Sequence, residues 1–326
     1  MAGTAGIGGK RSEHRNVSGL RGGLTGARIW TQGETEMASH RYMPGDLLIW
    51  LSFVTGLLVS LPASAAPFTT QRVMIPFVQK DGGVSQLDTM VLVPEGGRRF
   101  PLAVVSHGSP RYAYERDGMS PMRFDDMGQW LVSLGFAVAI PMRRGYGKSQ
   151  GAWAEGFGSC AHPDYRDAGR ASAQDIEAVI TYMRRQVYVD ANRVVLIGHS
   201  AGGWGSLAAA SENPPGLVGA VLFAPGRGSL APDEVCGADA LAATAGLFGK
   251  TTHLPTLWIY SENDHYLSPR LARDLYNGFR ATTDGPAEFI EEPNCSKDGH
   301  MLLFRCPDIW HTSVAAFLQR TVATTR

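Results

Sequence analysis

The sequence predicts an α/β fold with a mostly parallel central sheet. Short apolar runs alternate with segments of helical spacing from residue 101 onward, and two strand-like segments precede them with no helix between. The run 101–106 (PLAVVS) is almost wholly apolar, as are parallel strands that are buried on both faces. Alternation of this kind is typical of a parallel sheet whose strands are connected by helices.

The individual elements follow from local patterns. An Asp-Gly-Gly turn at 81–83 predicts a hairpin of two strands, and apolar spacing over 165–185 predicts a helix. The segments 143–163 and 225–253 are expected to be irregular, apart from a short helix at 239–247. The expected strands are 71–79, 86–94, 101–106, 136–141, 193–198, 218–223, 257–261 and 287–291. The expected long helices are 122–134, 165–185, 201–211, 269–280 and 308–320.

The first 65 residues predict export rather than catalysis. Residues 1–36 show no apolar periodicity, so we expect a disordered or upstream extension, with Met37 and Met43 as alternative starts. The apolar run 47–61 is 15 residues long, whereas a spanning helix needs about 20. It is followed by the small-residue pattern Ala63-x-Ala65, at which signal peptidases cleave. We therefore expect a signal peptide at 37–65 and a periplasmic or secreted protein; an uncleaved anchor or a buried core helix are the alternatives.

Cleavage after Ala65 would leave one catalytic domain, residues 66–326. It would remove six basic and four acidic residues from a chain with 30 of each, leaving a slightly acidic protein. A chain with no basic excess is not expected to bind nucleic acid. We likewise expect no stable membrane insertion after cleavage. The sequence leaves the oligomeric state open.

Four cysteines follow the predicted cleavage site. An even number of cysteines in an exported chain favours disulfide bonds. Of the three pairings that four cysteines allow, we favour Cys295 with Cys306 and Cys160 with Cys236; free buried thiols are the alternative. Their spacing does not match a zinc or redox motif.

The main chemical signal is the turn Gly198-His199-Ser200-Ala201-Gly202. It matches G-x-S-x-G, directly follows the apolar run RVVLIG and directly precedes a helix of small residues. In such a nucleophile elbow a sharp turn exposes the serine, and the flanking glycines prevent collisions. A glycine-rich turn without chemistry is the alternative. Ser200 is thus the candidate nucleophile, and it needs a base to accept its proton.

These residues resemble the α/β-hydrolase superfamily, and in particular its dienelactone-hydrolase-like and prolyl-oligopeptidase-like members, over residues 85–322. The resemblance implies a mostly parallel sheet with helices on both faces and the chain order serine, acid, histidine. It assigns the acid to Asp264, after the strand LWIYS, with Glu262 as the rival. It assigns the base to His300, before the last helix, in preference to His265 and His311. Dienelactone hydrolases carry cysteine at the elbow, so serine here favours a general ester substrate.

The resemblance also implies an oxyanion hole formed by the backbone N–H groups of Ala201 and Ser109. His107, in the His-Gly-Ser loop, is expected to support that loop. The turn 143–149 (RRGYGKS) resembles a family turn with an architectural role. Specificity is expected in the loops 111–121, 150–163 and 226–253. Tyr112, Tyr114, Trp153 and Trp204 are candidates for the pocket lining, but packing is the favoured explanation for each, so none is predicted to line the pocket.

The sequence therefore predicts an exported serine hydrolase that cleaves a small-molecule carboxylic ester or related acyl bond. The triad needs neither a metal nor a cofactor, and we expect none. A small serine peptidase of the prolyl-oligopeptidase-like type and an acyltransferase are the alternative enzymes. A non-catalytic binding protein is disfavoured because serine, acid and histidine are all present.

Overall fold

The computed structural model describes residues 67–79 and 82–323. The chain divides into two units, Met1–Leu61 and Pro62–Arg326, and all of the described residues lie in the second. The predicted extension, signal peptide and cleavage site lie outside the described residues, so export and the domain boundary at residue 66 stay predictions. No helix among the described residues is long and apolar enough to cross a membrane.

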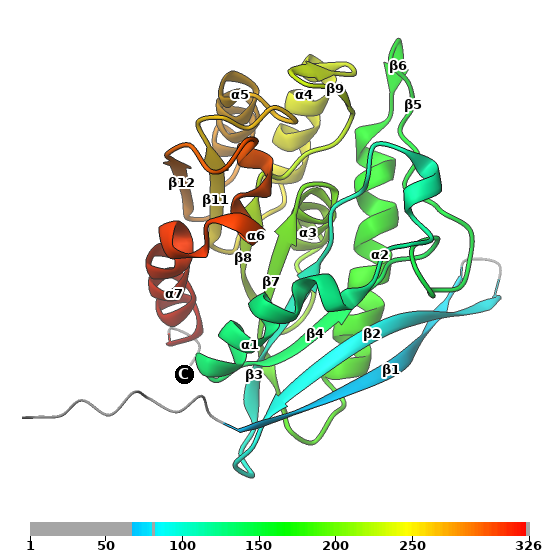
Figure 1. Ribbon diagram of the computed structural model, residues 1–326, viewed down its shortest axis with the longest axis vertical. Coiled ribbons are helices and arrows are strands. Elements are labelled where there is room, and N and C mark those ends of the chain that lie inside the picture. Colours follow the sequence, from blue (N-terminus) through cyan, green and yellow to red (C-terminus); the bar gives the residue numbers. More distant parts are fainter. Residues whose placement is uncertain (1–66, 80–81, 324–326) are drawn as a thin grey trace, which may run out of the picture. The chain divides into compact units, whose positions relative to one another are not determined.

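The core of the second unit is an eight-stranded sheet in the order β1-β2-β4-β3-β7-β8-β11-β12 (Figure 1). The strands are β1 (Phe68–Val78), β2 (Val84–Pro94), β3 (Phe100–Ser106), β4 (Ala137–Pro141), β7 (Val189–His199), β8 (Leu217–Phe223), β11 (Thr256–Ser261) and β12 (Ala287–Glu292). β1 and β2 form the predicted antiparallel hairpin. β2 is also antiparallel to β4, and the pairs from β4 to β12 are parallel.

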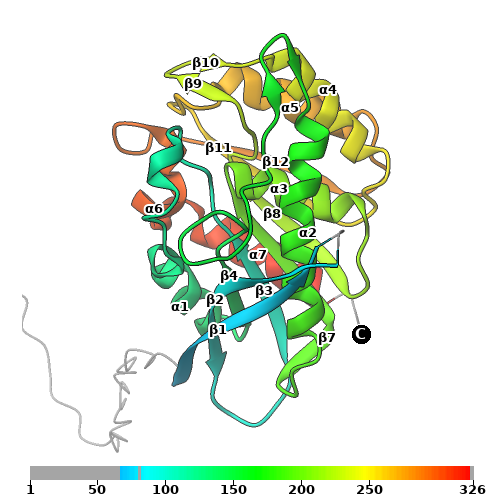
Figure 2. The same ribbon diagram turned by 90° about the vertical axis from the view of Figure 1, so that its right-hand side faces the viewer.

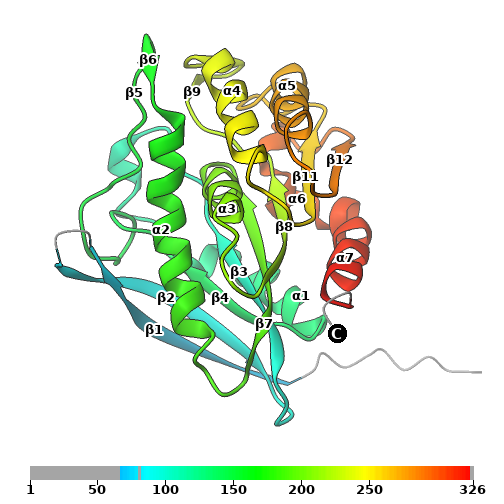
Figure 3. The same cartoon turned by 180° about the vertical axis from the view of Figure 1, so that it is seen from behind.

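Helices cover both faces of the sheet. α2 (Tyr165–Met183), α3 (Ala201–Ser211), α4 (Ala238–Gly249) and α5 (Pro269–Arg280) supply residues to one apolar core, and they lie in front of the sheet in Figure 3. α1 (Asp125–Ser133), α6 (Leu302–Arg305) and α7 (Pro307–Ala323) contribute to a second core on the opposite face. Figure 2 shows the sheet between the two groups. The predicted fold class and both-face arrangement are confirmed.

Several elements differ from the sequence prediction. The expected helix at 122–134 begins with a 3-10 turn, Pro121–Phe124, before α1. β7 begins at Val189, four residues earlier than predicted, because Val189 pairs with Phe100 beyond a register shift. The irregular segments contain two small hairpins, β5 with β6 (Gly158–Ser159, His162–Pro163) and β9 with β10 (Ser229–Ala231, Glu234–Val235).

Two disulfide bonds stabilise the loops, and both favoured pairings are confirmed. Cys160 is bonded to Cys236, which joins the β5–β6 hairpin to the start of α4. Cys295 is bonded to Cys306, so a short covalent loop encloses residues 296–305. Among the described residues no cysteine is free. His300 lies inside the second loop, whose ends are therefore fixed.

Candidate active site

The turn between β7 and α3 holds Ser200 in a strained conformation. Its φ is 55°, a left-handed value that side chains other than glycine rarely adopt. The backbone N–H of Ser200 donates to the carbonyl of Phe223 at 2.9 Å, and the carbonyl of Ser200 accepts from Trp204 at 2.9 Å. Strain of this kind is frequent at functional residues, so the geometry supports the nucleophile elbow that the sequence predicts.

The two glycines of the motif are required by close packing. A Cβ at position 198 would lie 2.5 Å from the carbonyl oxygen of Gly202. A Cβ at position 202 would collide with the carbonyl oxygens of Ser106 and His107, at the end of β3. The turn can therefore approach the loop after β3 only because both positions lack side chains.

Asp264 and His300 form a buried pair. The His300 Nδ1–H group donates to Asp264 Oδ2 at 2.9 Å, and the side chains are 4% and 0% exposed. Asp264 Oδ1 accepts from the backbone N–H groups of Tyr266 (2.7 Å) and Leu267 (2.8 Å). Burial raises the pKa of Asp264, but His300 and these donors outweigh burial, so the net pKa is lowered. Asp264 is thus held as a carboxylate that orients the imidazole.

The rival residues occupy other positions. His265 Nδ1 contacts Asp233 at 3.0 Å on the surface. His311 lies on α7 and stacks on Trp130, with the ring centroids 4.6 Å apart. Glu262 follows β11 and uses its backbone N–H to bind the carbonyl of Glu292. Among the described residues Asp264 is the only carboxylate that is hydrogen-bonded to the His300 ring. Ser200 and His300 line one cavity of about 640 Å³.

Two neighbours that the sequence prediction missed fix the position of His300. The ring of Tyr266 stacks on the His300 ring, with the centroids 4.2 Å apart and the planes at 7°. The buried His199 donates from Nε2 to the carbonyl of His300 at 2.8 Å. Burial, and then the charge of His300, lowers the pKa of His199 to about 3. His199 therefore remains neutral and acts as a hydrogen-bond donor to the loop that carries His300.

The loop after β3 lies against Ser200, the candidate nucleophile. A Cβ at Gly108 would be 3.1 Å from Ser200 Cβ, and both Ser109 and Ala201 line a second cavity with Ser200. This placement is compatible with the predicted oxyanion hole of two backbone N–H groups. His107 is fully buried, and its Nε2 accepts from the Arg143 backbone N–H at 3.0 Å. Burial lowers the pKa of His107 to about 3, so this neutral ring supports the loop as expected.

A buried charge network supports the same loop. Arg143 donates to the carbonyl of His107 at 2.6 Å and forms an ion pair with Glu155. Glu155 also accepts from Arg227 at 3.0 Å. The Tyr146 hydroxyl is hydrogen-bonded to both Glu155 Oε2 and Ser109 Oγ, each at 2.9 Å. The turn 143–149 is thus architectural, as predicted, but its partners Glu155 and Arg227 were not predicted.

Of the four candidates for the pocket lining, two line a cavity beside Ser200 and two do not. Tyr112 lines the larger cavity and Trp153 the smaller one. Trp204 is fully buried and donates its indole N–H to the carbonyl of Tyr165 at 2.8 Å. Tyr114 is 76% exposed and stacks on Tyr112. Both cavities are lined by residues of the predicted specificity loops. Among the described residues no cluster of His, Cys, Asp or Glu could hold a metal ion.

The sheet order and the serine turn after β7 define an α/β-hydrolase fold, as the predicted resemblance implies. A family model described as serine aminopeptidase, S33, matches residues 118–232, a segment that includes Ser200. No curated protein matches the chain.

Solved structures of the same fold cover most of the chain. An esterase from Pyrococcus furiosus is 16% identical, with a TM-score of 0.54 over 78% of this chain and 94% of its own. A putative dienelactone hydrolase from Klebsiella pneumoniae is 17% identical, with a TM-score of 0.51 over 79% and 98%. Est1E from Butyrivibrio proteoclasticus, solved with ferulic acid, is 17% identical, with a TM-score of 0.53 over 76% and 99%. The family model supports the predicted serine hydrolase, and these neighbours show its fold.

Proposed function

We propose that this protein is a serine hydrolase that cleaves carboxylic esters through an acyl-enzyme on Ser200. One observation carries the proposal. A serine strained at φ 55° lies in the same cavity as His300, which is hydrogen-bonded to the buried Asp264. A strained nucleophile beside an oriented imidazole is the arrangement that acyl transfer requires.

The proposed reaction has two steps. Ser200 Oγ attacks the ester carbonyl while His300 Nε2 accepts its proton, and the N–H groups of Ala201 and Ser109 stabilise the oxyanion. The ester C–O bond then breaks, and His300 gives the proton to the departing alcohol. In the second step water, deprotonated by His300, attacks the acyl carbon and restores Ser200. Asp264 stabilises the imidazolium form in both steps.

A panel of chromogenic substrates tests this proposal. We expect hydrolysis of 4-nitrophenyl acetate and butyrate to exceed hydrolysis of aminoacyl 4-nitroanilides, and we expect Ser200→Ala to abolish both while keeping its circular dichroism spectrum. Ester hydrolysis at the parental rate by Ser200→Ala would contradict the proposal.

The second candidate is a small serine peptidase, which the match to a serine aminopeptidase model favours. The same panel separates the two, because a peptidase would turn over the aminoacyl nitroanilides in preference to the simple esters.

We also propose export to the periplasm or the medium, on the strength of the sequence pattern at 37–65 and two disulfide bonds. Expression with and without residues 1–65, followed by cell fractionation, tests the export signal.

A further inference from the structure

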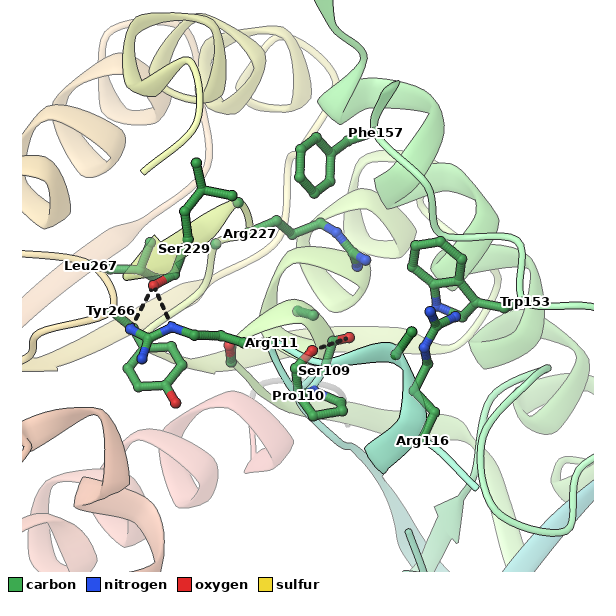
Figure 4. Close-up of a pocket in the computed structure, with 16 residues that line it drawn as sticks. Ser109, Pro110, Arg111, Arg116, Trp153, Phe157, Arg227, Ser229, Tyr266 and Leu267 are labelled. Carbon is green, nitrogen blue, oxygen red and sulfur yellow. Dashed lines mark hydrogen bonds between the residues drawn. The ribbon is translucent and has the colours of Figure 1, made fainter. Parts of the chain in front are cut away.

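The smaller cavity beside Ser200 is strongly cationic. It has a volume of about 190 Å³ and is lined by three arginines, Arg111, Arg116 and Arg227, with no aspartate or glutamate (Figure 4). The aromatic residues Trp153, Phe157 and Tyr266 complete much of its wall. A pocket for a plain alkyl chain does not require three guanidinium groups.

Arg111 and Arg116 are held by aromatic rings rather than by carboxylates. The Arg111 guanidinium lies 3.6 Å from the Tyr266 ring centroid and donates to Ser229 Oγ at 2.8 Å. The Arg116 guanidinium lies 3.9 Å from the Trp153 ring centroid. Among the described residues neither arginine has an ion-pair partner. Ser229 Oγ accepts from both Nε and Nη2 of Arg111, whereas Arg111 Nη1 and the Arg116 guanidinium have no hydrogen-bond acceptor among the described residues. Guanidinium N–H groups left available in this way match a carboxylate or phosphate.

Arg227 has an incomplete set of partners. It is 6% exposed and binds Glu155, but Arg143 shares the same carboxylate, so these three side chains carry a net positive charge. Arg227 Nε is buried and has no hydrogen-bond partner among the described residues. A buried donor without an acceptor is costly, and an anion bound nearby would lower the cost of the buried positive charge.

The position of His300 decides which part of an ester enters this pocket. The leaving alcohol must lie beside His300, which protonates it. His300 lines the larger cavity and does not line the smaller one, whereas Ser200 lines both. The alcohol therefore belongs in the larger cavity and the acyl group in the smaller one. Arg111 lines both cavities, whereas Arg116 and Arg227 line only the smaller of the two.

We propose that the acyl group of the substrate carries an anionic group, as in the half-ester of a short dicarboxylic acid. This inference rests on the proposed esterase function and adds its substrate class. The anion would bind at Arg111 and Arg116, with the positive field of Arg227 behind it. Hydrogen bonds between charged groups are strong and directional, and they would select such esters over neutral ones of the same shape.

Matched 4-nitrophenyl esters test the inference. The half-esters of succinate, glutarate and adipate are compared with neutral esters in which an isopropyl group replaces the carboxylate. Ser200→Ala gives the spontaneous rate for each compound. We expect kcat/KM to be at least about tenfold higher for one or more half-esters, and we expect the preference to shrink at high ionic strength.

Variants assign the preference to the arginines. In Arg116→Gln the ratio of anionic to neutral kcat/KM should fall about tenfold, and Arg116→Lys should retain part of it. Arg111→Gln should lower the ratio in the same way. The control is Arg166→Gln on the exposed surface of α2, which should leave the ratio unchanged. Retention of the ratio in both glutamine variants would overturn the inference, as would its complete loss in the lysine variant.

The two proposals fail differently. If neutral esters are hydrolysed in a Ser200-dependent way but no half-ester is preferred, the anion pocket is wrong and the esterase proposal stands. If no ester is hydrolysed faster than by Ser200→Ala, the esterase proposal is wrong and the inference falls with it.

Discussion

Replacing Glu155 by glutamine should remove the centre of the charge network that supports the loop after β3, which holds His107 and Ser109. The side chains of Arg143, Arg227 and Glu155 are at most 3% exposed. Glutamine keeps the size of the side chain but leaves two buried arginines without a counter-charge. Breaking a buried ion pair in this way costs about 3–5 kcal/mol. For a domain of this size that corresponds to a fall of roughly 6–20 °C in Tm.

The pH dependence gives the same prediction a second readout. Burial raises the pKa of Glu155, but Arg143 and Arg227 outweigh burial and lower the net pKa below the ordinary value of 4.5. A carboxylate with a lowered folded pKa stabilises the protein above its unfolded pKa, and this contribution is lost as the pH falls through the folded pKa. Wild-type stability should therefore decrease below about pH 4.5, and Glu155→Gln should lack that part of the decrease.

Thermal melts at pH 7 and at several values between pH 5 and 3 measure both effects. Glu95→Gln, at an exposed carboxylate after β2, is the matched control and should melt with the wild type. The ester-hydrolysis rate should also fall in Glu155→Gln, since the carbonyl of His107 is held by Arg143. A Glu155→Gln protein that melts within about 2 °C of wild type, with an unchanged acid dependence, would refute this account of the network.

Three further predictions concern the site itself. Asp264→Asn should lower kcat for ester hydrolysis by about 10³–10⁴-fold, because asparagine cannot stabilise the imidazolium; a loss below tenfold would contradict the role of Asp264. Gly202→Ala should fail to accumulate as folded protein, since its Cβ would collide with the backbone after β3, and a soluble, active variant would show that the turn can relax. Replacing Cys295 and Cys306 by alanine should lower the free energy of unfolding by about 3 kcal/mol through the lost loop constraint, measured by urea titration; an unchanged midpoint would contradict it.

Local patterns in the sequence predicted most of the fold. The bounds of α3 and α5 agree with the prediction because each helix follows a clear signal, the serine turn before Ala201 and Ser268-Pro269 before α5. The early start of β7 was missed because the pairing of Val189 with Phe100 depends on a distant strand. The α6 turn was missed because four residues carry too little periodicity to predict a helix.

The sequence predicted those residues of the site that a local motif or the chain order of the resembled superfamily identifies. The G-x-S-x-G turn predicted Ser200. The resemblance to the α/β-hydrolase superfamily, with its chain order of serine, acid and histidine, predicted Asp264 and His300, which the structure brings within hydrogen-bonding distance. Glu155 and Arg227 could not be found in this way, since they are 72 residues apart and lie in segments without a motif. Buried charges must be paired, but a sequence does not show which charges are buried.

The most direct test of the central claim is covalent labelling with a fluorophosphonate, followed by mass spectrometry of peptides. The wild-type protein should gain one adduct per chain, located on Ser200, and labelling should be much slower in His300→Ala, because the imidazole that activates Ser200 is then missing. Ser200→Ala should not react. An adduct on another residue, or equal labelling of Ser200→Ala, would contradict the assignment of Ser200 as the nucleophile.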